Sequence, residues 1–163
     1  MLFRSTNLIG HLRRDRKIGI VGPVSNNVGN EAKVAVGYED VEDLPRWAAG
    51  YTAAHAGETF PIEMLGFFCV VFSRAVYDAV GPLDERFGLG NFEDDDYCRR
   101  ITLLGYEVRY ASDAFVHHWQ HASFKLLPQH VVDDLFAANK AAYEAKWAVA
   151  WNTYATDAEQ AVA

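Results

Sequence analysis

Residues 90 to 100 of the 163-residue chain read Gly-Asn-Phe-Glu-Asp-Asp-Asp-Tyr-Cys-Arg-Arg. Four consecutive acidic residues, Glu93 to Asp96, follow a glycine-rich turn and precede apolar residues at helical spacing. Asn91 is a suitable N-cap and Gly105 a suitable residue just past a C-terminus, so we expect a helix between them. The carboxylates then lie in its first turn, where the helix dipole and unpaired N–H groups favour negative charge.

Two interpretations of this acidic run are open. A charge run is most often a solvated surface, which here would also cap the helix. Against this, four adjacent like charges repel, so the run costs stability unless a cation or a substrate offsets it. The run also follows a tight loop with glycines at positions 88 and 90, and functional side chains are commonly held on such loops.

The composition predicts one globular domain over residues 1–155, followed by a frayed tail at 156–163. Half of the residues are hydrophobic and 13% are aromatic, which excludes a disordered chain. The net charge of −7 argues against nucleic acid or anionic lipid as a partner. No apolar run reaches the roughly 18 residues of a membrane span, and no signal-peptide core is present. We expect Cys69 and Cys98 to be reduced thiols in a cytoplasmic protein, with a disulfide between them as the lesser alternative.

Apolar patterning predicts helices that alternate with strands. The expected helices are 1–14, 40–56, 74–80 with Ser73 as its cap, and one or two from 126 onward. The expected strands are 17–23, 65–72, 106–110 and 114–118. Because the two kinds of element alternate, we expect an α/β fold in which helices flank a mixed, mostly parallel sheet.

Three histidines, His117, His118 and His121, gather at the end of an expected strand. Imidazole is the commonest neutral metal ligand, but neighbouring strand residues point to opposite faces, so His117 and His118 cannot both face one ion without a bend. A structural zinc site would need four ligands, and no cysteine pair is near. One histidine joining carboxylates around Mg²⁺ or Mn²⁺ is a better use of the site, and ordinary surface or core histidines are the remaining interpretation.

Several motifs occur in order along the chain: Gly66-Phe-Phe-Cys69, Gly81-Pro-Leu-Asp-Glu-Arg-Phe87, Phe92-Glu-Asp-Asp-Asp-Tyr-Cys-Arg-Arg100, Val116-His-His118, and Ser123-Phe124. Ahead of them lies the strand and Ser-Asn loop at 18–27, and after them come Asn139, Tyr143 and Lys146-Trp147. From Met1 to Trp147, this ordered set resembles the second half of the catalytic domain of a family 2 glycosyltransferase with the GT-A fold.

The resemblance implies transfer of a sugar from a nucleotide-sugar to an acceptor hydroxyl on a glycan or other molecule, with inversion, as in polysaccharide biosynthesis. Asp94 would be the general base, and Glu93 and Asp95 would orient the base or the acceptor. His118, or as second choice His117, would bind a divalent Mg²⁺ or Mn²⁺ that neutralises the leaving diphosphate. The expected substrate-binding residues are Asn26, Asn27, Gly66, Phe67, Gly90, Asn91 and Trp119.

One departure from the family pattern changes the expectation. The sequence has no counterpart of the N-terminal half, which in this family binds the nucleotide and carries an Asp-X-Asp element. The one Asp-X-Asp pattern in the chain, Asp94-Asp95-Asp96, lies inside the acidic run and so does not supply that element. We therefore expect a fragment that is inactive alone, that self-associates through the surface left by the missing half, and whose full-length parent is membrane-peripheral. A non-catalytic sugar- or protein-binding module is the alternative function. A metallohydrolase is a third, and it would need the acids and histidines to meet on one ion.

Overall fold

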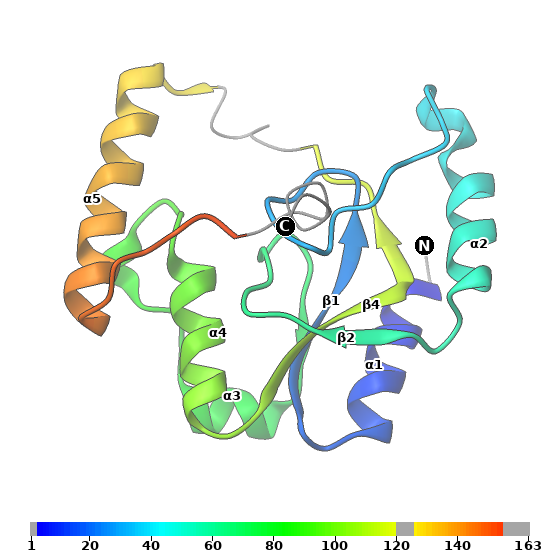
Figure 1. Ribbon diagram of the computed structural model, residues 1–163, viewed down its shortest axis with the longest axis horizontal. Coiled ribbons are helices and arrows are strands. Elements are labelled where there is room, and N and C mark those ends of the chain that lie inside the picture. Colours follow the sequence, from blue (N-terminus) through cyan, green and yellow to red (C-terminus); the bar gives the residue numbers. More distant parts are fainter. Residues whose placement is uncertain (1–2, 120–125, 155–163) are drawn as a thin grey trace, which may run out of the picture.

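The computed structural model describes residues 3–119 and 126–154. A four-stranded sheet with the order β2-β4-β1-β3 lies at its centre (Figure 1). The strands are β1 (Ile18–Ser25), β2 (Thr59–Pro61), β3 (Val71–Phe72) and β4 (Glu107–Val116). The two central strands, β1 and β4, run parallel, whereas β2 pairs antiparallel with β4 and β3 pairs antiparallel with β1. The protein is therefore α/β with a mixed sheet, as expected, but the expectation of a mostly parallel sheet is wrong, because β1 and β4 are the one parallel pair among these four strands.

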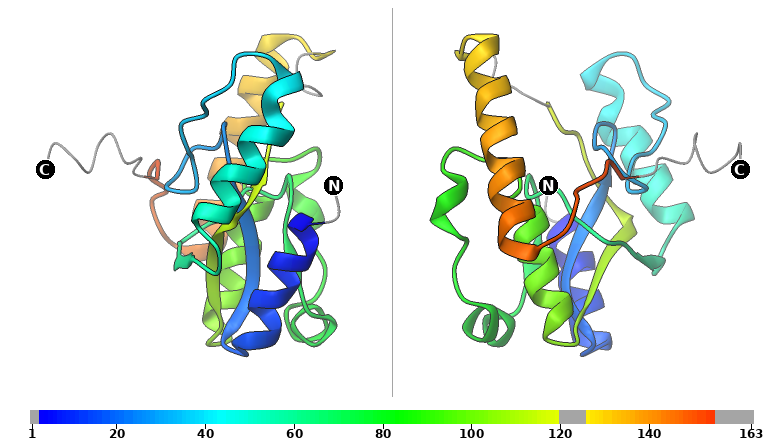
Figure 2. Two further views of the ribbon diagram at one scale, coloured as in Figure 1. Left: turned by 90° about the vertical axis from the view of Figure 1, so that its right-hand side faces the viewer. Right: turned by 60° about the vertical axis from the view of Figure 1, so that its left-hand side comes forward.

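Helices flank both faces of this sheet. They are α1 (Phe3–Arg14), α2 (Leu44–Ala54), α3 (Arg74–Val80), α4 (Glu93–Leu103) and α5 (Gln129–Trp147), with 3-10 turns η1 (Val41–Asp43) and η2 (Glu85–Phe87). Figure 2 shows α1 and α2 on opposite sides of the strands. No helix in the described part of the chain is long and apolar enough to cross a membrane.

Alternation along β1 divides the core between the two faces. Val21 packs with Leu8 of α1, while Ile20 packs with Tyr97 and Ile101 of α4. All five side chains are almost completely buried, and burying each contributes about 1.5–3 kcal/mol. The parallel pair and α4 are thereby locked together, which fixes the start of α4 relative to the carboxyl ends of β1 and β4.

The structure confirms several expected element ends. Ser73 caps α3, because its hydroxyl accepts a hydrogen bond from the Val76 N–H at 3.2 Å. Gly105 lies two residues beyond α4 with a left-handed φ of 84°, a backbone conformation that suits glycine. The expected helix at 40–56 is the turn η1 followed by α2, and the two expected strands at 106–110 and 114–118 are the single strand β4.

The expected strand over residues 65–72 is wrong for most of its length. Only Val71 and Phe72 pair with β1, and residues 65–70 form a loop. Its apolar side chains instead pack against the core around Ile20 and Tyr97. A continuous apolar run records burial, which a packed loop satisfies as well as a strand does. Both cysteines are thiols, which excludes the disulfide alternative.

Helix α5 stands beside α4 on the side away from the sheet, with the loop of residues 81–92 alongside them (Figure 1). A small aromatic core joins these parts, in which Phe87 and Phe92 pack with Tyr143 of α5. The last helix of the described chain therefore lies against the segment that leads into the acidic run.

Candidate functional site

A cavity of about 540 Å³ opens at the carboxyl ends of the two parallel strands. Its walls come from the loop after β1, the loop at 64–68, the start of α4, the two residues His118 and Trp119 that follow β4, and Phe136 and Trp151. Ligands of open α/β sheets bind at this end of the strands, because loops that follow parallel strands converge there. The cavity is therefore the best candidate site in the described part of the chain.

Most of the residues expected to act lie around this cavity. Its lining includes Glu93, Asp94, Asp95, His118, Asn27, Gly66, Phe67, Gly90, Asn91 and Trp119. Two expected residues are not part of the lining. The ring Nδ1 of His117 is 2.6 Å from the Tyr38 hydroxyl, and Asn26 Oδ1 accepts a hydrogen bond from the backbone N–H of His118 at 2.8 Å. His121 lies outside the described residues.

The backbone that enters α4 is unusual. Asn91 and Phe92 both have left-handed φ angles, 70° and 71°, and Phe92 rather than Asn91 occupies the N-cap position, without a side-chain hydrogen bond. The expected Asn91 cap is therefore wrong. Instead the Asp94 carboxylate accepts from the Asp95 N–H at 3.0 Å. A left-handed phenylalanine costs about 1–2 kcal/mol, so other contacts must hold this turn.

Helix α5 supplies those contacts. The buried side-chain amide of Asn139 donates to the carbonyl oxygens of Phe87, Gly90 and Asn91, at 2.7, 2.8 and 3.2 Å. The ring of Tyr143 packs against Phe92 with centroids 5.7 Å apart. These interactions fix three successive parts of the loop and so determine where the acidic side chains begin.

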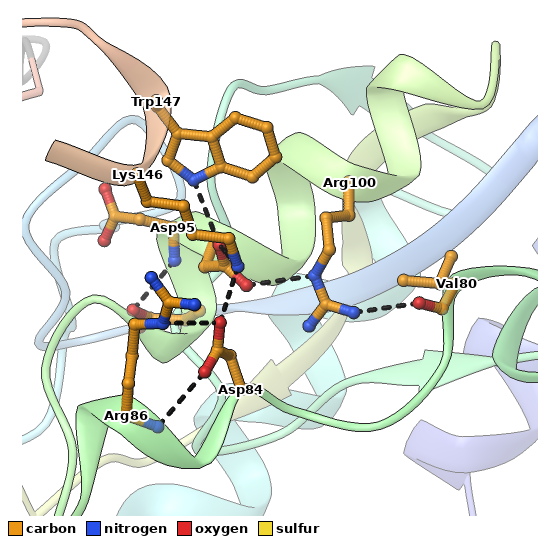
Figure 3. Close-up of polar contacts among 9 residues, drawn as sticks. Val80, Asp84, Arg86, Asp95, Arg100, Lys146 and Trp147 are labelled. Atoms are coloured by element: carbon orange, nitrogen blue, oxygen red, sulfur yellow. Dashed lines mark hydrogen bonds and ion pairs between the residues drawn. The ribbon is translucent and has the colours of Figure 1, made fainter. Parts of the chain in front are cut away.

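Asp96 is fully buried within a network of donors, of which Arg100, Lys146 and Trp147 are labelled in Figure 3. Lys146 Nζ lies 2.6 Å and Trp147 Nε1 3.0 Å from its Oδ1, and Arg100 Nε lies 2.9 Å from its Oδ2. Lys146 also contacts Asp84 Oδ2 at 2.7 Å, and this hydrogen bond holds the pKa of Asp84 well below its usual range. Asp96 is therefore a structural anion that ties α5 to α4, with no side available to a ligand.

The acidic run is thus not a solvated face. Glu93 and Asp94 are half-buried, and Asp95 and Asp96 are buried. Cations offset Asp96, and indole and phenol donors contact Asp95, whereas Glu93 Oε2 is a buried oxygen without a hydrogen-bond partner in the described structure. Burial raises the pKa of Glu93. The two carboxyl groups that line the cavity at the start of the run are therefore the two least compensated ones.

Asp94 carries the carboxyl group with the most perturbed pKa in the cavity lining. Burial, followed by the charges of Asp95 and Glu93, raises the pKa of Asp94 to about 8. We expected the start of the helix to keep this carboxyl ionised, but desolvation and the neighbouring anions outweigh the dipole. A carboxyl group that gains and loses its proton near neutral pH is typical of an acid–base centre.

His118 presents one nitrogen for chemistry. Its Nδ1–H donates to the carbonyl oxygen of Asn27 at 2.9 Å, so in the neutral ring Nε2 carries the lone pair. The ring is stacked on Phe68, with centroids 4.4 Å apart and planes inclined by 10°. The imidazole is therefore held in one orientation at the cavity wall.

The cavity also contains residues that the sequence did not indicate. Asn30 and Phe68 lie close to the predicted site residues Asn27 and Phe67 but were not themselves predicted. Phe136 and Trp151 come from the C-terminal region, for which the sequence predicted only packed helices. Trp151 Nε1 donates to Asp95 Oδ1 at 2.8 Å across 56 residues of sequence. No local pattern identifies such a partner, because the contact exists only once α5 has packed.

Among residues 3–119 and 126–154, no group of three or more histidine, cysteine, aspartate or glutamate side chains could hold a metal ion. Within that part of the chain, Glu93, Asp94, Asp95 and His118 share the cavity lining without forming such a group. No family model matches the chain, and no curated protein matches it.

Proposed function

We propose that this chain forms the acceptor-binding side of a glycosyltransferase domain of the GT-A type, with Asp94 as the general base. The observation that carries the proposal is the Asp94 carboxyl group, which lines the 540 Å³ cavity and has a pKa raised to about 8. Support also comes from the α/β fold with its cavity at the strands' carboxyl ends, and from the ordered motifs that resemble family 2 glycosyltransferases.

The chemistry assigned to Asp94 is one proton transfer. An acceptor hydroxyl donates a hydrogen bond to the ionised carboxylate, and its oxygen attacks the anomeric carbon of the donor sugar. As the new carbon–oxygen bond forms, the bond to the nucleoside diphosphate breaks with its electron pair, and the hydroxyl proton passes to Asp94. A base whose pKa is close to the working pH combines a useful ionised fraction with a useful proton affinity.

The cavity lining favours a polyhydroxylated acceptor without negative charge. Three carboxyl groups line it, and its described lining contains no lysine or arginine. The rings of Phe67, Phe68 and Trp119 offer apolar faces of the kind that pack against the C–H faces of sugars. A nucleoside diphosphate would meet repulsion here, so we place the acceptor, not the donor phosphates, in this cavity.

The proposal is tested by binding and titration together. The ¹³C carboxyl signal of Asp94 is followed from pH 5 to 10, alone and with neutral mono- and disaccharides at millimolar concentration. We expect a bound acceptor to lower the titration midpoint of Asp94, because its hydroxyl stabilises the ionised carboxylate. Asp94→Asn should still bind the sugar but lose the pH dependence of its Kd.

The same experiment separates the main alternative. A non-catalytic sugar-binding module is the alternative, and the aromatic rings in the cavity lining suit it as well. Such a module would bind sugars while the Asp94 midpoint stayed where it was. If no saccharide in the panel binds, both the acceptor-site proposal and the sugar-binding alternative are refuted.

A further inference from the structure

The segment after α5 turns back and passes the start of α4 (Figure 1). Ala148 ends the helix with a left-handed φ of 53°, and the Trp151 backbone N–H donates to Glu144 Oε1 at 2.9 Å. The Trp151 indole packs between Phe92 and Phe136, with ring centroids 5.1 and 5.9 Å away. Residues 148–154 are therefore held at the first turn of α4 by backbone and ring contacts.

This segment brings two donors to a single carboxylate oxygen. Asp95 Oδ1 accepts from the Trp151 indole N–H at 2.8 Å and also from the Tyr154 hydroxyl. Asp95 is only 7% exposed, so each donor replaces solvation that the buried carboxylate has lost. Asp95 also lies between two cavities, because it lines the 540 Å³ cavity together with Trp151 and a neighbouring cavity of about 420 Å³ together with Tyr154.

The neighbouring carboxyl group, that of Asp94, receives fewer hydrogen bonds than that of Asp95. Within the described structure, Asp94 accepts a hydrogen bond from the Asp95 backbone N–H at 3.0 Å, and no indole, phenol or cation bonds to it. Two neighbouring buried carboxyl groups do not both ionise easily, and a shared proton settles on the one whose anion is less stabilised. Because Asp95 has more hydrogen-bond donors than Asp94, we expect the shared proton to reside on Asp94.

We propose that Trp151 and Tyr154 are positioning residues that keep Asp95 as the fixed anion of the pair and so leave Asp94 as the group that exchanges a proton with the ligand. This inference rests on the proposed role of Asp94 as the base, and it adds two residues from the segment after α5 to the site. Neither residue touches the reacting atoms; both act through Asp95.

Other charged or titratable groups surround the pair. They are Glu93, Cys98 and Arg99 on α4, Tyr143 on α5, Tyr154 after it, Glu63 after β2 and His118 after β4. Burial raises the pKa of Tyr154, Tyr143 and the Cys98 thiol, so these groups stay protonated at neutral pH. Tyr154 therefore remains a donor to Asp95 throughout the range in which Asp94 titrates.

The test removes each donor while keeping an aromatic ring. In the full chain, Tyr154→Phe and Trp151→Phe are compared with the wild type by following the Asp94 ¹³C carboxyl signal against pH. We expect the Asp94 midpoint to fall by about one pH unit in each variant, because Asp95 then takes a share of the proton. Trp147→Phe is the matched control, since it removes an indole donor from Asp96 instead, and it should leave the Asp94 midpoint in place.

An unchanged Asp94 midpoint in both variants would overturn the inference. Tyr154→Phe removes a single oxygen, so it provides the decisive reading if Trp151→Phe does not fold. The outcome is also distinct from that of the acceptor-site test. Failure of all saccharides to bind refutes the proposed function, whereas a midpoint shift in the two variants still establishes that this segment controls the proton of Asp94.

Discussion

Replacing Asp94 by asparagine should make the protein more stable at neutral pH. The native state holds this carboxyl group with a pKa raised from 3.8 to about 8, whereas the unfolded chain has the ordinary value. The contribution of Asp94 to stability is therefore full below about pH 4 and is lost as the pH rises toward 8, because only the unfolded state ionises in that window. The amide introduced by Asp94→Asn cannot ionise, so this variant avoids the loss.

The size of the effect follows from the width of that window. Each pH unit in which only the unfolded state is ionised costs the native state about 1.4 kcal/mol. Between pH 4 and pH 7 the loss reaches about 4 kcal/mol at most, and partial relaxation around the buried carboxyl group reduces it. We expect Asp94→Asn to gain about 2–4 kcal/mol in the free energy of unfolding at pH 7, and almost nothing at pH 4.

Urea denaturation at pH 4, 6 and 8 measures this difference directly, provided that the m-values of the two proteins agree. Asp78→Asn is the matched control, because Asp78 lies on α3 with 55% of its side chain exposed and forms a surface ion pair with Arg74. Its effect should stay within about 0.5 kcal/mol at every pH. If the advantage of Asp94→Asn is the same at pH 4 and pH 8, then native Asp94 is not protonated at neutral pH, and the reasoning about the base fails.

Three further predictions concern the surroundings of the site. Asn139→Ala should lower the free energy of unfolding by about 2–4 kcal/mol in urea titrations, because three loop carbonyls lose their donor; Asn139→Asp, which has no N–H to donate, should not restore it. Lys146→Met should destabilise the protein by about 3 kcal/mol at pH 6. Lys146 lowers the pKa of Asp84, so their contact stabilises the protein fully above the ordinary pKa of an aspartate and less as the pH falls toward 2. In thermal melts, the loss caused by Lys146→Met should therefore shrink over that range, and a loss that does not change with pH would contradict this role of the Lys146–Asp84 contact. A saccharide carrying a carboxylate should bind about tenfold more weakly by calorimetry at about pH 8 than its neutral counterpart, since the Asp95 carboxylate, and Asp94 where it is ionised, repel it; equal Kd values would argue against this cavity as the acceptor site.

Local sequence signals located the parts of the fold that depend on local interactions. Ser73 and Gly105 mark the start of α3 and the end of α4 because a cap and a left-handed turn involve residues three or four positions apart. The strand predicted over residues 65–72 was wrong because it depended on distant contacts. The apolar side chains there pack against residues of β1 and α4, and such packing does not require strand pairing. The Asn91 cap was wrong because Asn139, 48 residues away, holds that loop in a conformation no local rule predicts.

The same distinction applies to the candidate site. The acidic run and His118 could be selected from the sequence, since they form short and unusual clusters. The direction of the Asp94 pKa could not, because burial by distant segments and not the adjacent helix start dominates it. Trp151 and Tyr154 carried no recognisable signal, as they reach Asp95 only through the turn that follows α5.

The first turn of α4 depends on contacts from α5 and the residues after it, which has a consequence for how the protein matures on the ribosome. The partners of Asn91 and Asp95 lie 48 and 59 residues further along the chain, so they are synthesised well after the sheet and α4. A nascent chain that has not yet released residues 139–154 from the exit tunnel lacks the donors that these residues supply to Asp95 and Asp96. The acidic turn therefore becomes ordered only after residues 139–154 have emerged, and a protein cut before Asn139 loses the contacts that hold this turn.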